Sequence, residues 1–267
     1  MSELALSVLC WNVHGLPAPF SKDRRARLAR VAGEVARERP DVVAFQEAWI
    51  DGARRLARAL PGYEPCFVAW REDWVRGGLM VAVRRGGDWE LDAAGIHFRE
   101  FSRGGPLWKV WQADGLARKG ALFVPLHRGA TRLWFVNVHL QARYPLEPYT
   151  EMRLAQLREL GQWLDDLGQA CPVVTAGDFN TPADEEPVYR EIARLGVDAC
   201  VASHRDERDV TNYPVHSSAA WIDYVLARPA AGGSASGTTR LIRNRRVDDP
   251  YSDHHGLVCR ITLRPRG

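Results

Sequence analysis

The sequence predicts an α/β fold in which layered β-sheets carry helices on their outer faces. Two observations support this prediction. Short apolar runs recur along the whole chain, and a few longer segments between them have apolar residues at three-to-four spacing. Several runs are apolar almost without interruption, as in strands that are buried on both faces. Many strands and few helices favour packed sheets.

Each expected strand is dominated by apolar residues, many of them β-branched or aromatic. The segments are LALSVLCWNV, DVVAFQ, GGLMVAV, GALFVPL, RLWFVNVHL, PVVTAGD, AWIDYVLA and GLVCRITL. The expected helices are amphipathic and should coat the outer sheet faces. They span Asp23 to Arg39, Asp51 to Leu60, Glu147 to Leu167 and Asp184 to Leu195.

We expect one domain over residues 1–267, because a layered fold of this length forms around one core. The stretch AAGGSASGTT, residues 230–239, has the composition of a linker and is predicted to be a flexible loop between two strands. No repeat period is apparent along the chain.

Composition points to an ordinary globular protein, with 46% hydrophobic and 26% charged residues. The net charge of +3, from 36 basic and 33 acidic residues, neither favours nor excludes a polyanionic partner. Four arginines cluster near the C-terminus, and a solvated strand edge explains them better than a phosphate-binding stripe. These are Arg240, Arg243, Arg245 and Arg246.

The five cysteines are odd in number and lack C-x-x-C spacing, so we expect them to be reduced and buried. The N-terminal residues do not resemble a secretion signal, and no apolar stretch is long enough for a transmembrane segment. We therefore expect a monomeric cytoplasmic protein, with peripheral attachment to a membrane left open.

Five of the expected strands end in polar residues that could meet at one edge of the fold. Strand ends are where layered folds place chemistry. Each residue alone could be a solvated loop start or a satisfied structural group, but five such ends together favour a site. The residues are Asn12, Glu47, His139, Asp178 with Asn180, and Asp253 with His254.

Two of these groups have specific chemistry. Asp178 and Asn180 alternate after a buried strand, so both side chains can face one side and contact water, a metal or a phosphate. Asp253 precedes His254 directly, and a carboxylate beside an imidazole can fix its tautomer for general-base catalysis. Glu47 follows a buried strand and could bind a hard cation. Oxygen ligands without a Cys/His cluster favour Mg²⁺ or Mn²⁺ over structural zinc.

At these positions the chain resembles the endonuclease/exonuclease/phosphatase superfamily. Its motifs occur in order as WNVHG, FQEAW, NVHLQA, GDFNTP, WIDYVLA and SDHHGL, essentially from end to end. The resemblance implies a four-layer α/β sandwich, with two packed mixed β-sheets flanked by helices. It also implies a metal-dependent phosphoric ester hydrolase that uses one water attack and no covalent intermediate.

Site roles follow from the same resemblance. Glu47 is the implied main Mg²⁺ ligand, with Asn12 and Asp253 nearby, and Mn²⁺ is an expected substitute. His254 resembles the general base, and His139 and Asn180 the contacts to the scissile phosphate. Asp178 resembles the residue that orients the water or helps to protonate the leaving oxygen. Asp223 of WIDYVLA resembles a partner that supports His139.

Within the superfamily the chain is most similar to neutral-sphingomyelinase-type phosphodiesterases, through FSKDRRARL and DGLARKG. In the second motif, Asp114 and Lys119 match family positions, and Lys119 could approach the substrate phosphate or form a surface ion pair. Trp108 and Trp111 border this element and suit a lipid interface, a core or nucleobase stacking.

The substrate therefore stays open between a sphingomyelin-like or other phospholipid headgroup and nucleic acid. A DNA endonuclease or exonuclease, a small-molecule or phosphoinositide phosphatase, and a binding module without catalysis are the alternatives. Loops around Trp74, Trp108 and Tyr144 should decide between a pocket and an open groove.

Overall fold

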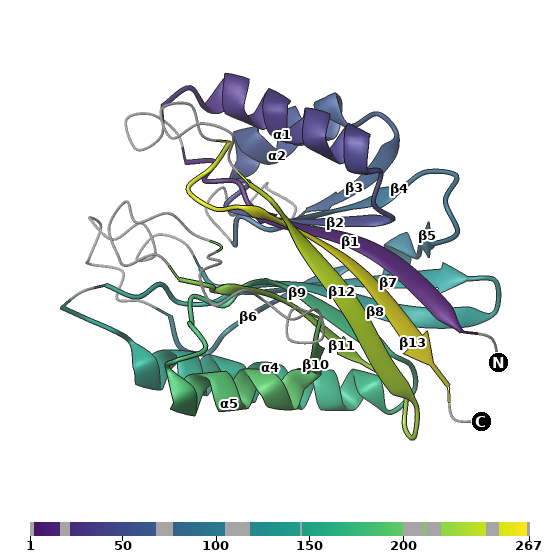
Figure 1. Cartoon of the computed structure of the whole chain (residues 1–267), viewed down its shortest axis with the longest axis vertical. Helices are drawn as coiled ribbons and strands as arrows, with labels where there is room; N and C mark the ends of the chain where they lie inside the picture. The colour runs from purple at the N-terminus through teal and green to yellow at the C-terminus, as the bar shows by residue number, and fades with distance from the viewer. Residues whose placement is uncertain are drawn as a thin grey trace.

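A computed structural model of the chain describes residues 3–16, 22–67, 77–104, 118–144, 146–199, 211, 220–243 and 251–265. Figure 1 shows two β-sheets packed face to face, with helices on the outer face of each sheet. This arrangement confirms the predicted four-layer α/β sandwich. Several residues named above lie outside the described residues. They are Trp74, Trp108, Trp111, Asp114, Cys200, Arg245 and Arg246.

The first sheet has, among the described residues, the strand order β12-β13-β1-β2-β4-β3. Its central pair, β1 and β2, is parallel and the other pairs are antiparallel, so the sheet is mixed. The bounds are β1 Leu4–Asn12, β2 Val42–Gln46, β3 Tyr63–Phe67, β4 Met80–Arg84, β12 Ser234–Ile242 and β13 Gly256–Arg264.

The second sheet has the order β10-β11-β9-β8-β7-β5 in the same part of the chain, and β6 also pairs with β7. Here β8 and β9 form the parallel pair. The bounds are β5 Glu90–Leu91, β6 His97–Glu100, β7 Gly120–Arg128, β8 Thr131–His139, β9 Val173–Asp178, β10 Val197–Asp198 and β11 Asp223–Arg228.

In the part of the chain that the structure describes, helices cover the outer face of each sheet, as the amphipathic segments predicted (Figure 1). The first sheet carries α1 (Arg24–Glu38) and α2 (Ile50–Ala59), and the second carries α4 (Thr150–Gly168) and α5 (Glu186–Leu195). A short 3-10 helix, Ala93–Gly95, precedes β6. In the described part of the chain, none of the helices combines the length and the hydropathy needed to cross a bilayer.

The alternation of side chains along β1 shows how the layers are held together. Leu6, Val8 and Cys10 belong to the cluster that includes the space between the sheets. Leu9 and Trp11 belong to the cluster beneath α1 and α2. Because successive strand residues point to opposite faces, one apolar run serves two cores.

A buried amide pair joins the two sheets just beneath the strand ends. Gln46 Nε2 of β2 donates to Asn137 Oδ1 of β8 at 2.7 Å. Asn137 Nδ2 in turn donates to the carbonyls of Phe45 and Met80 at 2.9 and 3.0 Å. A satisfied polar network in an apolar core fixes relative position, because any shift leaves a buried group unpaired. The network therefore fixes the spacing of the sheets where the site lies.

The linker-like stretch at residues 230–239 is not the predicted flexible loop. Only its first residues form a turn, and Ser234 begins the nine-residue edge strand β12, which pairs with β13 along its whole length. Its small polar residues have weak strand preference, but the available hydrogen-bonding edge of β13 overrides it. Arg240 lies on this strand, exposed and ion-paired with Glu38, as expected for a solvated edge.

Candidate active site

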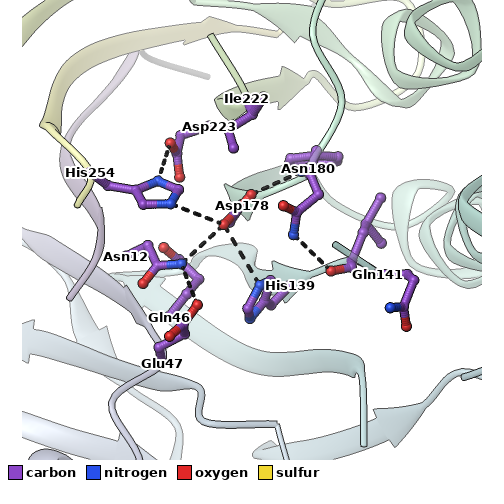
Figure 2. A network of polar contacts seen from close by, with 12 residues as sticks. Asn12, Gln46, Glu47, His139, Gln141, Asp178, Asn180, Ile222, Asp223 and His254 are labelled. Carbon is purple, nitrogen blue, oxygen red and sulfur yellow. Dashed lines mark hydrogen bonds and ion pairs between the residues drawn. The ribbon is translucent and has the colours of Figure 1, made fainter. Parts of the chain in front are cut away.

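Strand register brings the predicted residues together at one edge of the sandwich. Asn12 ends β1 and aligns with Gln46 at the end of the parallel strand β2. His139 ends β8 and aligns with Asp178 at the end of the parallel strand β9. Ligand sites in α/β sheets lie beyond the carboxyl ends of parallel strands. The two parallel pairs thus deliver four polar ends to one place (Figure 2).

Left-handed backbone conformations aim several of these side chains. Glu47 has φ 53°, His14 has φ 43° and Asn180 has φ 50°. Asparagine and histidine adopt such conformations more often than most residues, whereas for Glu47 the left-handed backbone is strained and persists because the surroundings enforce it. Gly15 contributes here, because its N–H donates to the Glu47 carbonyl at 3.0 Å and a Cβ would lie 2.4 Å from that oxygen. The segments WNVHG and FQEAW are therefore hydrogen-bonded and closely packed against each other.

The Asp178 carboxylate is the centre of the polar network in Figure 2. Asn12 Nδ2 donates to its Oδ2 at 3.0 Å and the Asn180 N–H donates to its Oδ1 at 2.8 Å. The Nε2 atoms of His139 and His254 lie 3.6 and 3.7 Å from Oδ2. Burial, and next the charge of Asp223, raise the pKa of Asp178 to about 7. This carboxyl can therefore exchange a proton near neutrality.

His254 is held by Asp223, whose Oδ2 lies 2.8 Å from Nδ1. Two expectations are wrong here: Asp223 does not support His139, and Asp253 is not the carboxylate that orients His254. Asp223 aligns with Asp178 across the antiparallel pair β11 and β9, which places its side chain beside His254. Burial alone would lower the pKa of His254, but Asp223 and Asp178 raise it well above its ordinary value.

His139 contacts a buried lysine as well as Asp178. Lys119 Nζ lies 2.9 Å from its Nε2, and both side chains are buried. Lys119 is therefore not the surface side chain that one interpretation of its motif expected. Burial, and next the charge of Lys119, lower the pKa of His139 well below its ordinary value. This imidazole is neutral and lies beside a fixed positive charge.

Asn180 has its side chain in the same pocket as Asp178. Its Nδ2 donates to the Leu140 carbonyl at 3.0 Å, which joins the ends of β8 and β9. Gly177 makes this close packing possible, since a Cβ there would lie 2.0 Å from the Val138 carbonyl. Asn180 lies beyond the end of β9 with a left-handed backbone, so strand alternation is not what places its side chain.

Glu47, Asn12 and Asp253 form a more open group beside this network. Asn12 Nδ2 donates to Glu47 Oε1 at 3.0 Å, so one amide bridges Glu47 and Asp178. Asp253 is not in direct contact with Glu47 but shares a neighbour with it. His14 Nδ1 lies 3.4 Å from Asp253 Oδ2 and 3.7 Å from Glu47 Oε2. Two part-exposed carboxylates and an amide oxygen are donors that suit a hard divalent cation.

A second group could also hold a metal. One ligand atom each from Asp178, Asp223 and His254 lie within 4.8 Å of one another. These three residues are buried, and the Asp223 carboxylate accepts a hydrogen bond from the His254 Nδ1–H. The Glu47 group is more exposed and so easier for an ion from solvent to reach, which makes it the better candidate.

Sequence reasoning missed the residues that hold the site loops. Arg27 is buried and donates to the carbonyls of Val13, His14 and Tyr251 at 3.1, 2.9 and 3.0 Å. Ser252 Oγ donates to the Asn12 carbonyl at 2.6 Å. Both tie the loop after β1 to the loop before β13. The segment FSKDRRARL contains Arg27, but nothing in its spacing shows which carbonyls it binds.

Comparison with solved structures identifies the fold. TDP2 from D. rerio, humanized by 14 mutations, aligns with a TM-score of 0.74 and 18% identity over 96% of this chain and 98% of that one. An endonuclease/exonuclease/phosphatase from Bacteroides vulgatus gives 0.75 and 17% over 98% and 100%. Beta toxin from Staphylococcus aureus gives 0.73 and 14% over 95% and 99%.

Sequence comparison adds a relative and a family. A Drosophila melanogaster protein named "Putative neutral sphingomyelinase" is 26% identical over 184 residues, which are 67% of this chain and 40% of that protein. This chain therefore aligns with less than half of that relative. A family model described as "Endonuclease/Exonuclease/phosphatase family" matches residues 9–254, nearly the whole chain. The chain belongs to the endonuclease/exonuclease/phosphatase family, whose members are phosphoric ester hydrolases.

Proposed function

We propose that this protein is a Mg²⁺-dependent phosphodiesterase that hydrolyses a P–O bond in one step by water attack. The single observation that carries the proposal is the His254–Asp223 pair, whose free imidazole nitrogen faces the buried Asp178 beside the Glu47 group. A base, its orienting carboxylate, a second ionisable carboxyl and oxygen donors are the groups that phosphoryl transfer to water requires.

The proposed role of each residue follows from its environment. Asp223 accepts a hydrogen bond from Nδ1 of His254 and orients Nε2, and the raised pKa makes the deprotonated form of His254 a strong acceptor for a proton of the attacking water. Asp178, with a pKa of about 7, can orient that water or supply a proton to the leaving oxygen. Asn180 can donate to a phosphoryl oxygen. His139, kept neutral next to Lys119, adds a hydrogen bond and a nearby positive charge where negative charge develops.

Glu47, Asp253 and Asn12 are the residues that would hold the cation. When bound, a divalent metal polarises a phosphoryl oxygen and offsets the charge that builds in the transition state. Enzymes of this family depend on such a metal. Mg²⁺ fits the oxygen donors, and Mn²⁺ is the expected substitute.

For the substrate we propose a phospholipid headgroup of the sphingomyelin type. Support comes from the named Drosophila relative and from DGLARKG, whose Lys119 lies inside the site beside His139. The loop after β8 exposes Leu146 to solvent near Tyr144, which suits contact with a lipid surface. Nucleic acid is less favoured because Arg240 is ion-paired with Glu38.

The experiment compares release of phosphocholine from sphingomyelin in mixed micelles, cleavage of an abasic oligonucleotide, and release of phosphate from a phosphoinositide. Each is measured with Mg²⁺, with Mn²⁺ and with EDTA. Metal-dependent turnover of sphingomyelin supports the proposal. Turnover confined to DNA or to a phosphomonoester would replace the lipid assignment.

Two variants show whether the activity measured in that experiment comes from this protein or from a contaminant. His254→Gln and Glu47→Gln should each lose activity by on the order of 10²–10⁴ while keeping the folded circular dichroism spectrum. Asp165→Asn, a surface change distant from the site, should keep full activity. Activity that survives both site variants, or an inactive wild type on all three substrates, would contradict the proposed chemistry.

A further inference from the structure

His14 lies between the two carboxylates of the open group. Its Nδ1 is 3.4 Å from Asp253 Oδ2 and 3.7 Å from Glu47 Oε2. Among the described residues, it is the one basic side chain within ion-pair distance of either carboxylate. The three side chains are 29%, 25% and 19% exposed, so ions from solvent can reach them.

Hydrogen bonds of its backbone hold His14 in this position. Its N–H donates to Asn12 Oδ1 at 3.0 Å, and its carbonyl accepts from Arg27 Nη2 at 2.9 Å. The residue also has φ 43°, a left-handed backbone conformation that histidine adopts more often than most residues. These backbone contacts fix the position from which the His14 side chain reaches the two carboxylates.

The distances suit shared coordination. Adjacent ligands of an octahedral cation with bonds of about 2.1 Å lie about 3 Å apart. The nitrogen-to-oxygen separations at His14 exceed this by less than 1 Å, so small side-chain rotations would bring all three atoms onto one ion. Imidazole nitrogen binds Mn²⁺ and later transition metals more strongly than Mg²⁺, which prefers oxygen.

We propose that His14 is a nitrogen ligand of the cation held by Glu47 and Asp253, and that it makes the site selective for Mn²⁺ or a later transition metal over Mg²⁺. This inference rests on the cation site of the proposed function and refines its metal. The functional consequence is that the enzyme responds to transition-metal supply and not only to the more abundant Mg²⁺.

The test uses the full chain loaded with one equivalent of Mn²⁺ and measures ¹⁴N modulation of the electron spin echo. His14→Asn is the informative variant, because asparagine tolerates the left-handed backbone and replaces the nitrogen by an amide oxygen. His254→Asn is the matched control, since it removes the other imidazole that could bind a metal nearby. Affinities for Mn²⁺ and Mg²⁺ are measured by calorimetry on all three proteins.

We expect nitrogen modulation in the wild type and in His254→Asn, and its loss in His14→Asn. The ratio of the Mg²⁺ to the Mn²⁺ dissociation constant should fall by about 10-fold or more in His14→Asn. Modulation that persists in His14→Asn but disappears in His254→Asn would overturn the inference and place the metal at Asp178. A wild type that binds Mn²⁺ without nitrogen modulation would also overturn it.

The same measurements distinguish this inference from the proposed function. Nitrogen coupling from His14 in a protein that hydrolyses no phosphodiester would keep the ligand assignment and reject the activity. Hydrolysis with a bound cation that shows no nitrogen coupling would keep the activity and reject the ligand assignment. Failure to bind either metal at millimolar concentration would remove the cation site itself and both proposals with it.

Discussion

The two halves of the candidate site differ in how deeply their ionisable side chains are buried. In the closed half, the side chains of Asp178, Asp223 and His254 are at most 8% exposed and lie against one another. In the open half, Glu47, Asp253 and His14 are 19–29% exposed, and the shortest ion-pair distance is 3.4 Å, compared with 2.8 Å in the closed half.

This difference indicates what each half is built to do. Buried ionisable groups that are hydrogen-bonded to one another have fixed geometry and shifted proton affinities, as proton transfer requires. Part-exposed carboxylates without a close basic partner other than His14 in the described structure keep oxygen atoms available for an ion from solvent. We therefore assign proton transfer to the closed half and cation binding to the open half.

The largest expected effect belongs to the closed half. Asp223→Asn should lower kcat by about 10³–10⁴, because the amide no longer favours the tautomer of His254 that leaves Nε2 free to accept a proton. The measurement is kcat against pH at saturating metal, with metal affinity determined in parallel. An unchanged metal affinity together with a strongly lowered kcat would support the assignment of proton transfer to the closed half and cation binding to the open half. Weaker metal binding as the main effect would contradict that assignment.

Glu47→Gln tests the open half, where the main expected effect is on metal affinity. Loss of the charged ligand should weaken Mn²⁺ binding at least about 100-fold, whereas the stability of the metal-free protein should change by less than about 0.5 kcal/mol. Stability should hold because the side chain is part-exposed and glutamine can keep the hydrogen bond from Asn12. Calorimetric metal titration and urea unfolding in EDTA check both values. Tight binding that survives would assign the cation to the closed half.

Asp178→Asn should alter how stability depends on pH. Burial, and next the charge of Asp223, raise the pKa of Asp178 from 3.8 to about 7, so the folded protein keeps a proton that the unfolded chain releases. That stability is fully present below pH 4 and is lost as the pH rises through about 7. The variant lacks this loss. Between pH 5 and pH 8, its free energy of unfolding should therefore rise by about 2–3 kcal/mol relative to that of the wild type.

Urea unfolding of the metal-free proteins at both pH values measures this gain. Unfolding without metal matters here, because a bound cation would itself change the proton affinity of a neighbouring carboxyl. A stability difference between the two proteins that stays constant from pH 5 to pH 8 would show that Asp178 titrates normally. The closed half would then lack the proton affinity assigned to it.

The smallest effect is expected outside both halves. Asp165 is an exposed carboxylate that pairs with Arg228 on the far side of the second sheet from the first. Asp165→Asn should change stability by less than about 0.5 kcal/mol and leave kcat and metal affinity unaltered, because exposed ion pairs contribute little. A clear loss of activity would show that the site depends on general surface charge and not on the two halves.

The layered fold and most site residues could be predicted from local patterns. Short apolar runs such as DVVAFQ and FVNVHL, rich in β-branched and aromatic residues, favour strands, and the polar residues that end them are then expected at strand ends. Residues 230–239 show where this reasoning fails. Their composition is that of a loop, yet the edge of β13 pairs with them as β12. Strand pairing is a tertiary interaction, and local composition does not contain it.

The sequence by itself gave a set of candidate site residues from its motifs: Asn12, Glu47, His139, Asp178, Asn180, Asp223, Asp253 and His254. Only the tertiary structure decided their partners. Asp223 binds His254 and not His139, and Lys119 lies buried against His139. The physical reason is that register across sheet pairs sets which side chains meet, and residues such as Asp178 and Asp223 are brought opposite each other by an antiparallel pairing that no local spacing encodes.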